Sequence, residues 1–161
     1  MNTPIGFGHA SEPEGTPLHY TACGLGDVYL LSGYEIEDTP HGRTLSIRHL
    51  DELHRTIGLF IARHKKVMNG RDLRFLRKQM DLTQSELGAQ IGLSSQQIAR
   101  GEKGESEISG PTDRLVRALY LQFVTGELDL RKLVTRLDKS DASETGRTVF
   151  ESTRRGWKIA A

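Results

Sequence analysis

The sequence predicts a mainly α chain: a five-helix domain, a small α+β module in front of it and a short β-hairpin at the end. Three observations predict this fold class. Apolar residues recur at helical spacing in several segments between residues 50 and 138. Before residue 50, runs rich in β-branched and aromatic residues flank a turn that contains glycine. Thr83 and Ser94 each precede a helical segment with a matching capping residue three positions later.

The composition suits a soluble protein with a modest core, because 36% of the 161 residues are hydrophobic and 27% are charged. No apolar run approaches the length of a membrane span. The start of the chain lacks a basic region followed by an apolar stretch, so no secretory signal is expected. The single cysteine, Cys23, cannot form an internal disulfide, and this favours a reducing compartment. The cytoplasm is therefore the expected location.

Charge is unevenly distributed along the chain, although the net charge is only +1. Residues 1–50 contain six acidic and two basic residues, whereas residues 62–103 contain nine basic and four acidic ones. A basic segment of this kind is often only a solvated face. It also suits a module that binds a polyanion, joined to a part with another task.

Four segments are predicted along the chain. Residues 1–16 are rich in Gly, Pro, Glu and Thr without periodicity and predict a flexible tail. Residues 17–66 predict the small α+β module, and residues 67–138 predict the five-helix domain. Residues 139–161 predict a polar linker followed by the terminal hairpin.

The front module is predicted to begin with two strands, Leu18–Cys23 and Val28–Ile36. The turn between them contains two glycines, which is typical of a hairpin. Thr44–Arg48 is a possible third strand. From Leu50 the apolar period becomes helical, which predicts a helix to about Lys66.

The second half of the chain is predicted to contain two more helices and the hairpin. Pro111 suits the first turn of a helix that Gly126 interrupts, and a shorter helix follows around residues 130–137. The apolar faces after Pro111 form either a dimer surface or the core of the domain; the residues concerned are Val116, Leu119, Tyr120 and Phe123. In the terminal hairpin, residues 148–159, Trp157 is expected to pack the hairpin onto the rest of the protein.

The central segment carries the most informative pattern. A first helix has Leu73, Leu76 and Met80 on one face, and its basic residues are expected to face solvent: Arg71, Arg74, Arg77 and Lys78. Thr83 with Glu86, and Ser94 with Gln97, each form a capping box at the start of a further helix. Gly88 lies where these two helices must approach closely, and Gly92 lies in the tight turn between them.

Residues 70–124 resemble the helix-turn-helix family of phage repressors, often called XRE or Cro/repressor. The five-helix domain is therefore interpreted as repressor-like. The matching residues are Leu73-x-x-Leu76-Arg77, Leu82-Thr83-Gln84-x-x-Leu87-Gly88, Ile91-Gly92-Leu93-Ser94 and Ile98-Ala99-Arg100-Gly101-Glu102-Lys103-Gly104. One position departs from the family, because Gly101 stands where a large apolar or aromatic residue is usual. Either a neighbouring side chain fills this gap or the domain is less stable than its relatives.

The resemblance implies sequence-specific binding of double-stranded DNA and transcriptional regulation, as in a repressor that acts as a homodimer on two half-sites. Capped helix starts at Thr83 and Ser94 suit phosphate, and Gln84 resembles the family glutamine that holds the DNA backbone. Ser95, Gln96 and Arg100 are expected to face base edges. Gln97 and Lys103 are expected to touch phosphate. The alternative is that all these side chains are ordinary solvent-facing residues.

The two-module layout also resembles antitoxins of the MqsA type, whose front module binds zinc through four cysteines. This chain has only Cys23, so the resemblance is one of architecture, and the zinc site is absent. It implies an alternative function in which the front half neutralises a protein partner.

No enzyme activity, metal or cofactor is expected. Cys23 lacks a base at a recognisable spacing, and neither His19 nor His41 supplies one. Cys23 with His19, His41 and His49 shows no spacing typical of metal ligands.

Overall fold

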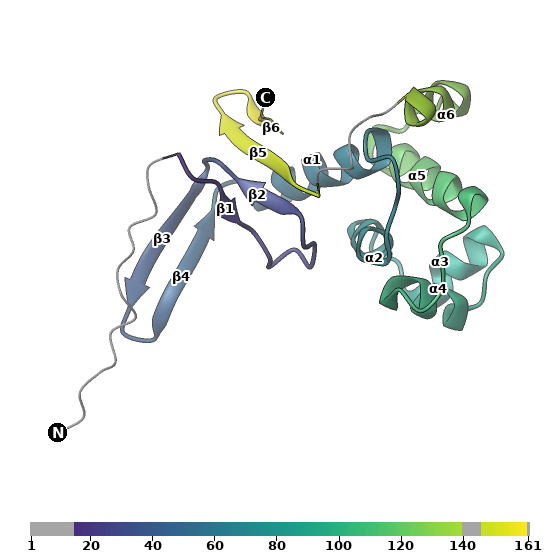
Figure 1. Cartoon of the computed structure of the whole chain (residues 1–161), viewed down its shortest axis with the longest axis horizontal. Helices are drawn as coiled ribbons and strands as arrows, with labels where there is room; N and C mark the ends of the chain where they lie inside the picture. The colour runs from purple at the N-terminus through teal and green to yellow at the C-terminus, as the bar shows by residue number, and fades with distance from the viewer. Residues whose placement is uncertain (1–14, 140–145, 161) are drawn as a thin grey trace.

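The computed structural model describes residues 15–139 and 146–160, which contain six helices and six strands. Strands gather at one end of the molecule and helices at the other, and α1 connects the two ends (Figure 1). The predicted fold class, mainly α, is matched only loosely. The described strands form a four-stranded sheet and a two-stranded sheet, which is more β structure than the sequence predicted. The tail predicted for residues 1–16 lies mostly outside the described residues, as do residues 140–145 of the linker.

Six strands form two sheets. The four-stranded sheet has the order β1-β2-β5-β6, and β3 and β4 form a separate two-stranded sheet. The strands are β1 (Leu18–His19), β2 (Val28–Leu30), β3 (Tyr34–Thr39), β4 (Gly42–Ile47), β5 (Thr148–Thr153) and β6 (Gly156–Ile159). Because β5 pairs parallel to β2, residues about 120 positions apart in the chain share one sheet.

The helices follow the predicted order. They are α1 (Leu50–Arg63), α2 (Gly70–Gln79), α3 (Gln84–Ile91), α4 (Ser95–Lys103), α5 (Gly110–Thr125) and α6 (Leu130–Lys139). Helices α2 to α5 fall within the segment predicted for the five-helix domain, and α6 extends one residue beyond its predicted end at 138. Helix α1 ends three residues before the predicted Lys66. None of the helices in the described ranges is long and apolar enough to cross a membrane.

The front strands differ from the prediction at two points. The first strand, predicted as Leu18–Cys23, ends at His19. The segment predicted as a single strand, Val28–Ile36, is divided, because Gly33 adopts a positive φ of 83° and the chain turns there into a second sheet. The hairpin between the first two predicted strands is confirmed, with Leu18 opposite Leu30. The possible third strand is confirmed as β4, which pairs with β3 in an arm that projects from the body of the molecule (Figure 1).

The terminal hairpin is confirmed, and its position was not predicted. Strand β5 continues the front sheet beside β2, so the hairpin does not stand alone. Trp157 is buried, and its indole N–H donates to the carbonyl oxygen of Arg48 over 3.1 Å. The predicted packing role of Trp157 is therefore confirmed.

The apolar residues of α5 divide between the core of the domain and its surface. Val116 and Tyr120 are buried and complete the core, where Tyr120 packs against Gly58 of α1. Burial raises the pKa of Tyr120 to about 12. Phe123, by contrast, is 61% exposed, and Leu119 is half-buried. Only the outer edge of α5 therefore remains available as a dimer surface.

Candidate nucleic-acid interface

Both predicted capping boxes are present at the starts of α3 and α4. The Thr83 hydroxyl accepts from the backbone N–H of Glu86, whose carboxylate accepts from the N–H of Thr83 over 2.8 Å. Ser94 and Gln97 repeat the arrangement at α4. Each box satisfies two backbone N–H groups that the helix itself leaves unpaired. The starts of the two helices are therefore fixed by local hydrogen bonds.

The glycines between these helices have the roles that the sequence indicated. A β-carbon at Gly88 would collide with the carbonyl oxygen of Leu93 in the turn. Gly92 ends α3 with a φ of 77°, in the left-handed region where a β-carbon is unfavourable. These two positions let α3 and α4 cross at short range, with Leu87 and Ile98 buried between them and the rest of the domain.

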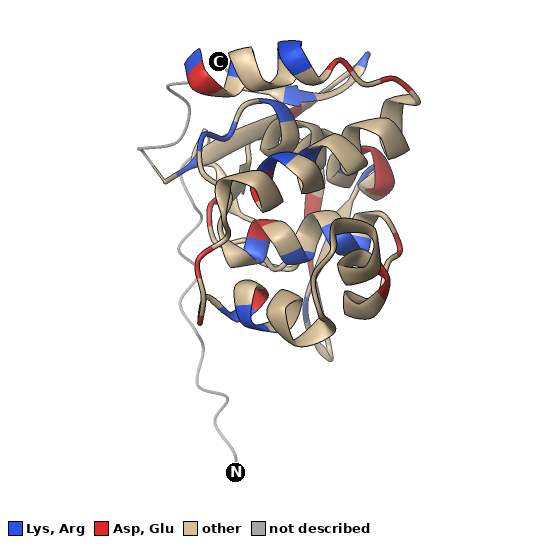
Figure 2. Cartoon of the chain, turned by 90° about the vertical axis from the view of Figure 1, so that its right-hand side faces the viewer, with Lys and Arg blue, Asp and Glu red and all other residues tan. Residues whose placement is uncertain are grey.

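The outer edge of α4 is polar and exposed. Ser95, Gln96 and Arg100 are exposed and lie on one helix of nine residues, whereas Ile98 on the opposite side is buried. Thr83, Ser94, Gln97 and Lys103 are exposed as well, and Gln84 is half-buried. Figure 2 views the molecule from the end that carries these helices. The structure thus brings the predicted site residues together at one end of the domain.

Arg77 is an exception to the prediction that the basic residues of α2 face solvent. It is only 8% exposed, and its guanidinium binds both carboxylate oxygens of Glu102 in α4. It also donates to the carbonyl oxygen of Leu82 over 2.8 Å. The prediction was wrong because position 77 shares the core-facing side of α2 with Leu73 and Met80.

The Gln84 amide takes part in the same network. Its Nε2 donates to the second oxygen of Glu102 over 2.9 Å. The network therefore joins α2, the start of α3 and the end of α4 through one carboxylate. A buried bidentate pair of this kind fixes orientation, so Gln84 is positioned before any ligand arrives.

Leu73 and Ile108 border the space beside Gly101. Gly101 is buried, and a β-carbon there would lie 3.5 Å from Leu73 and 3.9 Å from Ile108, both ordinary contact distances. Gly70 lies against the carbonyl oxygens of Gly101 and Glu102, where its own β-carbon would collide. A methyl group therefore fits between Gly101 and its neighbours Leu73 and Ile108 without a clash.

We expect Gly101→Ala to raise the free energy of unfolding by about 0.5–1 kcal/mol, because alanine loses less backbone entropy in a helix and fits the available space. Urea unfolding followed by circular dichroism measures the change. Gly88→Ala is the matched control and should destabilise the domain, because its β-carbon meets backbone. A loss of stability in Gly101→Ala would contradict this account of the packing.

Cys23 and His54 lie in partly buried surroundings in the front module. Cys23 is half-buried, its thiol donates to the carbonyl oxygen of Tyr20, and burial raises its pKa. A raised thiol pKa reduces the thiolate fraction that nucleophilic attack requires. His54 accepts or donates a hydrogen bond with the Tyr20 hydroxyl over 3.0 Å, and burial lowers its pKa. Over the described ranges, no group of three or more His, Cys, Asp or Glu side chains is placed to hold a metal ion.

Comparison with known families supports the interpretation of the central segment. Residues 73–112, from α2 into α5, match the family model of helix-turn-helix domains. Comparisons with curated proteins and with solved structures give no match. Together with the two capped helices and the glycine turn, the family match defines a helix-turn-helix domain, with α3 and α4 as its helix pair.

Proposed function

We propose that this protein is a sequence-specific regulator of transcription that binds double-stranded DNA through α4. The observation that carries the proposal is the exposed edge of Ser95, Gln96 and Arg100 on the second helix of a helix-turn-helix pair. In such pairs the second helix enters the major groove by its first turns. Glutamine binds adenine at two points and arginine binds guanine likewise, so these side chains suit direct reading of base edges.

Other side chains suit the DNA backbone. The capped start of α3 at Thr83 and Gln84 presents backbone N–H groups and the positive end of the helix dipole. Lys103 and the Gln97 amide group lie on the same helix as the base-reading residues. Ser94 caps that helix. Phosphate contacts of this kind fix the register of the protein on the duplex without selecting a sequence.

A dimer is the form in which we propose that the protein acts. One recognition helix reads few base pairs, so two copies on two half-sites give the required specificity. Leu115 and Phe123 are exposed on α5, and half-buried Leu119 lies between them at a spacing of four residues. This outer stripe of α5 is the proposed dimer surface. A homodimer predicts that selected binding sites contain inverted half-sites.

Selection of bound sequences from a random DNA pool tests the proposal, followed by titration of single-base variants. We expect Arg100→Ala to lose about 1–3 kcal/mol of discrimination at one base position. Lys103→Ala should weaken binding to all sequences alike and lower the salt slope by about 0.9. Arg131→Ala on α6 is the matched control and should change neither quantity. Identical behaviour of Arg100→Ala and Lys103→Ala would contradict the assigned roles.

A second function, binding of a protein partner by the front module, is favoured by the projecting β3–β4 hairpin. Both strands are exposed over most of their length, and Ile36 lies opposite Leu45 with 41% and 39% of their surfaces exposed. An exposed apolar pair on a two-stranded arm suits a protein contact. The arm would then serve an antitoxin-like task beside DNA binding. A co-purifying protein that is lost when the hairpin is removed distinguishes this function from DNA binding alone.

A further inference from the structure

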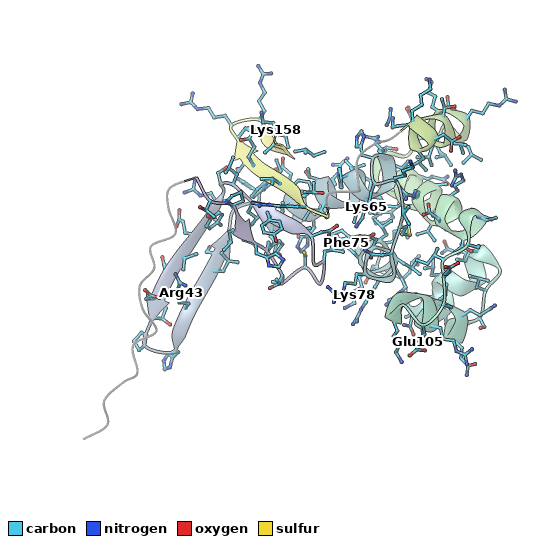
Figure 3. The ribbon with its side chains drawn as sticks, in the orientation of Figure 1. Arg43, Lys65, Phe75, Lys78, Glu105 and Lys158 are labelled. Atoms are coloured by element: carbon cyan, nitrogen blue, oxygen red, sulfur yellow. The ribbon has the colours of Figure 1, made fainter. Side chains whose placement is uncertain are left out.

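A groove lies between the front module and the helix-turn-helix domain, at the C-terminal end of α4. We call it the inter-module groove; it is bounded by residues 19–26 on one side and by α2 and the last turn of α4 on the other. Its volume is about 920 Å³. Figure 3 places Lys78 beside this region, between the front strands and α4. A smaller hollow adjoins it past Gly26 and Arg71.

The wall that α2 contributes to the groove is strongly basic. Arg71, Arg74 and Lys78 recur at helical spacing on one exposed face, and Lys103 joins them from α4. Within the described part of the chain, none of these four cations has an ion-pair or hydrogen-bond partner. The basic side chains Lys65, Arg77 and Arg117 are, by contrast, buried and paired. Four cations that are unpaired among the described residues therefore line the groove.

No free carboxylate neutralises this wall among the groove-lining residues. Glu102 borders the groove, but its two oxygens are engaged by Arg77 and Gln84. Asp27, in the adjoining hollow, binds the Lys65 ammonium over 2.8 Å. A groove with unpaired cations and occupied carboxylates attracts an anion.

The opposite wall contains several small residues beside His19 and Leu25. Ala22, Gly24 and Gly26 line it, and the Arg71 guanidinium lies only 2.7 Å from where a β-carbon of Gly26 would be. The His19 ring bonds to the Gly26 carbonyl oxygen over 2.9 Å and holds this loop in place. The absence of a side chain at Gly26 therefore leaves room for the Arg71 guanidinium beside the loop.

The length and position of the basic wall favour a nucleic-acid strand over a small anion. Seven residues of helix separate Arg71 from Lys78, a rise of about 10 Å. Successive phosphates of one strand rise by about 3.4 Å along the duplex axis and lie farther apart along the strand itself, so this length spans about two or three of them. Lys103 belongs both to the last turn of α4 and to the groove, so a strand that leaves the proposed recognition helix meets the groove next.

We propose that the inter-module groove binds the phosphate backbone of the same duplex that α4 reads, beyond the bases that α4 contacts. The proposal rests on the proposed function. Arg71, Arg74 and Lys78 each neutralise a phosphate, and the front loop fixes the direction in which the strand runs. The front module thereby extends the DNA footprint of the helix-turn-helix domain and adds affinity without adding base specificity.

The test compares the salt dependence of DNA binding between two variants that each lose three exposed cations. The groove variant is R71Q/R74Q/K78Q, and the control is R131Q/R136Q/K139Q on α6, at the opposite end of the helical domain (Figure 1). The DNA is the duplex selected by the wild-type protein, with long flanks. We expect the slope of log affinity against log salt to fall by about 2–3 in the groove variant, at roughly 0.9 per phosphate. The control should keep the wild-type slope.

Duplexes shortened on one side or the other give a second measurement. Removing the flank on the groove side should lower the salt slope of the wild-type protein to the value of the groove variant. The salt slope of the groove variant itself should not change. An unchanged slope in the groove variant, with site-specific binding intact, overturns this inference and leaves the proposed function standing. Failure of the wild-type protein to bind any duplex overturns both. Unfolding curves of the two variants, which alter only exposed residues, establish that each is folded.

Discussion

Replacing Arg117 with methionine is expected to lower the free energy of unfolding by about 3–5 kcal/mol. Arg117 is completely buried, and its guanidinium binds the Asp113 carboxylate one helical turn away. It also donates to the carbonyl oxygens of Ile61 and Lys65, where α1 ends. Methionine keeps much of the volume but leaves the buried Asp113 carboxylate without its ion-pair partner and these carbonyl groups without the Arg117 donor.

Arg114→Met provides the matched control for this prediction. Arg114 lies in the same helix, and its partner Asp138 is 62% exposed. Exposed pairs contribute about 0–1 kcal/mol, so this variant should unfold close to the wild type. Equilibrium unfolding in urea measures both variants. A loss below about 1 kcal/mol for Arg117→Met would mean that the buried network does not hold α1 and α5 together.

Lys65→Met is expected to cost about 3–5 kcal/mol at pH 7, because it breaks a buried ion pair by removing one partner. The Lys65 ammonium contacts Asp72 and Asp27, both at 2.8 Å, and Asp72 is completely buried. Burial raises the pKa of Asp72, and the charge of Lys65 opposes that rise. Without Lys65, the pKa of Asp72 is expected to rise further.

The sign of the pH dependence follows from this shift. A carboxyl whose pKa is higher in the folded than in the unfolded state stabilises the fold most below its unfolded pKa, about 3.9 for Asp. That contribution is lost as the pH rises. The difference in stability between Lys65→Met and wild type should therefore be smaller near pH 4 than near pH 7. Lys66→Met, which alters the exposed neighbouring lysine, is the control, and a pH-independent difference would show that Asp72 is not the group responsible.

Local features of the fold were predictable from the sequence, whereas long-range pairings were not. The capping boxes of α3 and α4 join residues three positions apart, and Gly92 marks a turn by its own backbone requirement. The parallel pairing of β2 with β5 joins distant segments and leaves no signal in either strand. For this reason the terminal hairpin was predicted, but its place in the front sheet was not.

Buried charges were the main omission in the candidate site. Arg77 pairs with Glu102 across 25 positions, and Arg117 reaches carbonyl groups more than 50 positions away. A signal was available for both, because each arginine stands on the apolar side of its helix, Arg117 between Val116 and Ala118. Periodicity finds such positions, but only the partner's location shows whether the charge is satisfied there.

The parallel pairing of β2 with β5 makes the helical domain an insertion within the front sheet. All of α2 to α6 lies in the chain between the two strands that must meet. During synthesis, β2 cannot pair with β5 until the helices between them have been made. The local contacts of the helices can therefore form first. The β1–β2 hairpin is local and is made first, but its pairing with β5 across the sheet is among the last contacts that can form.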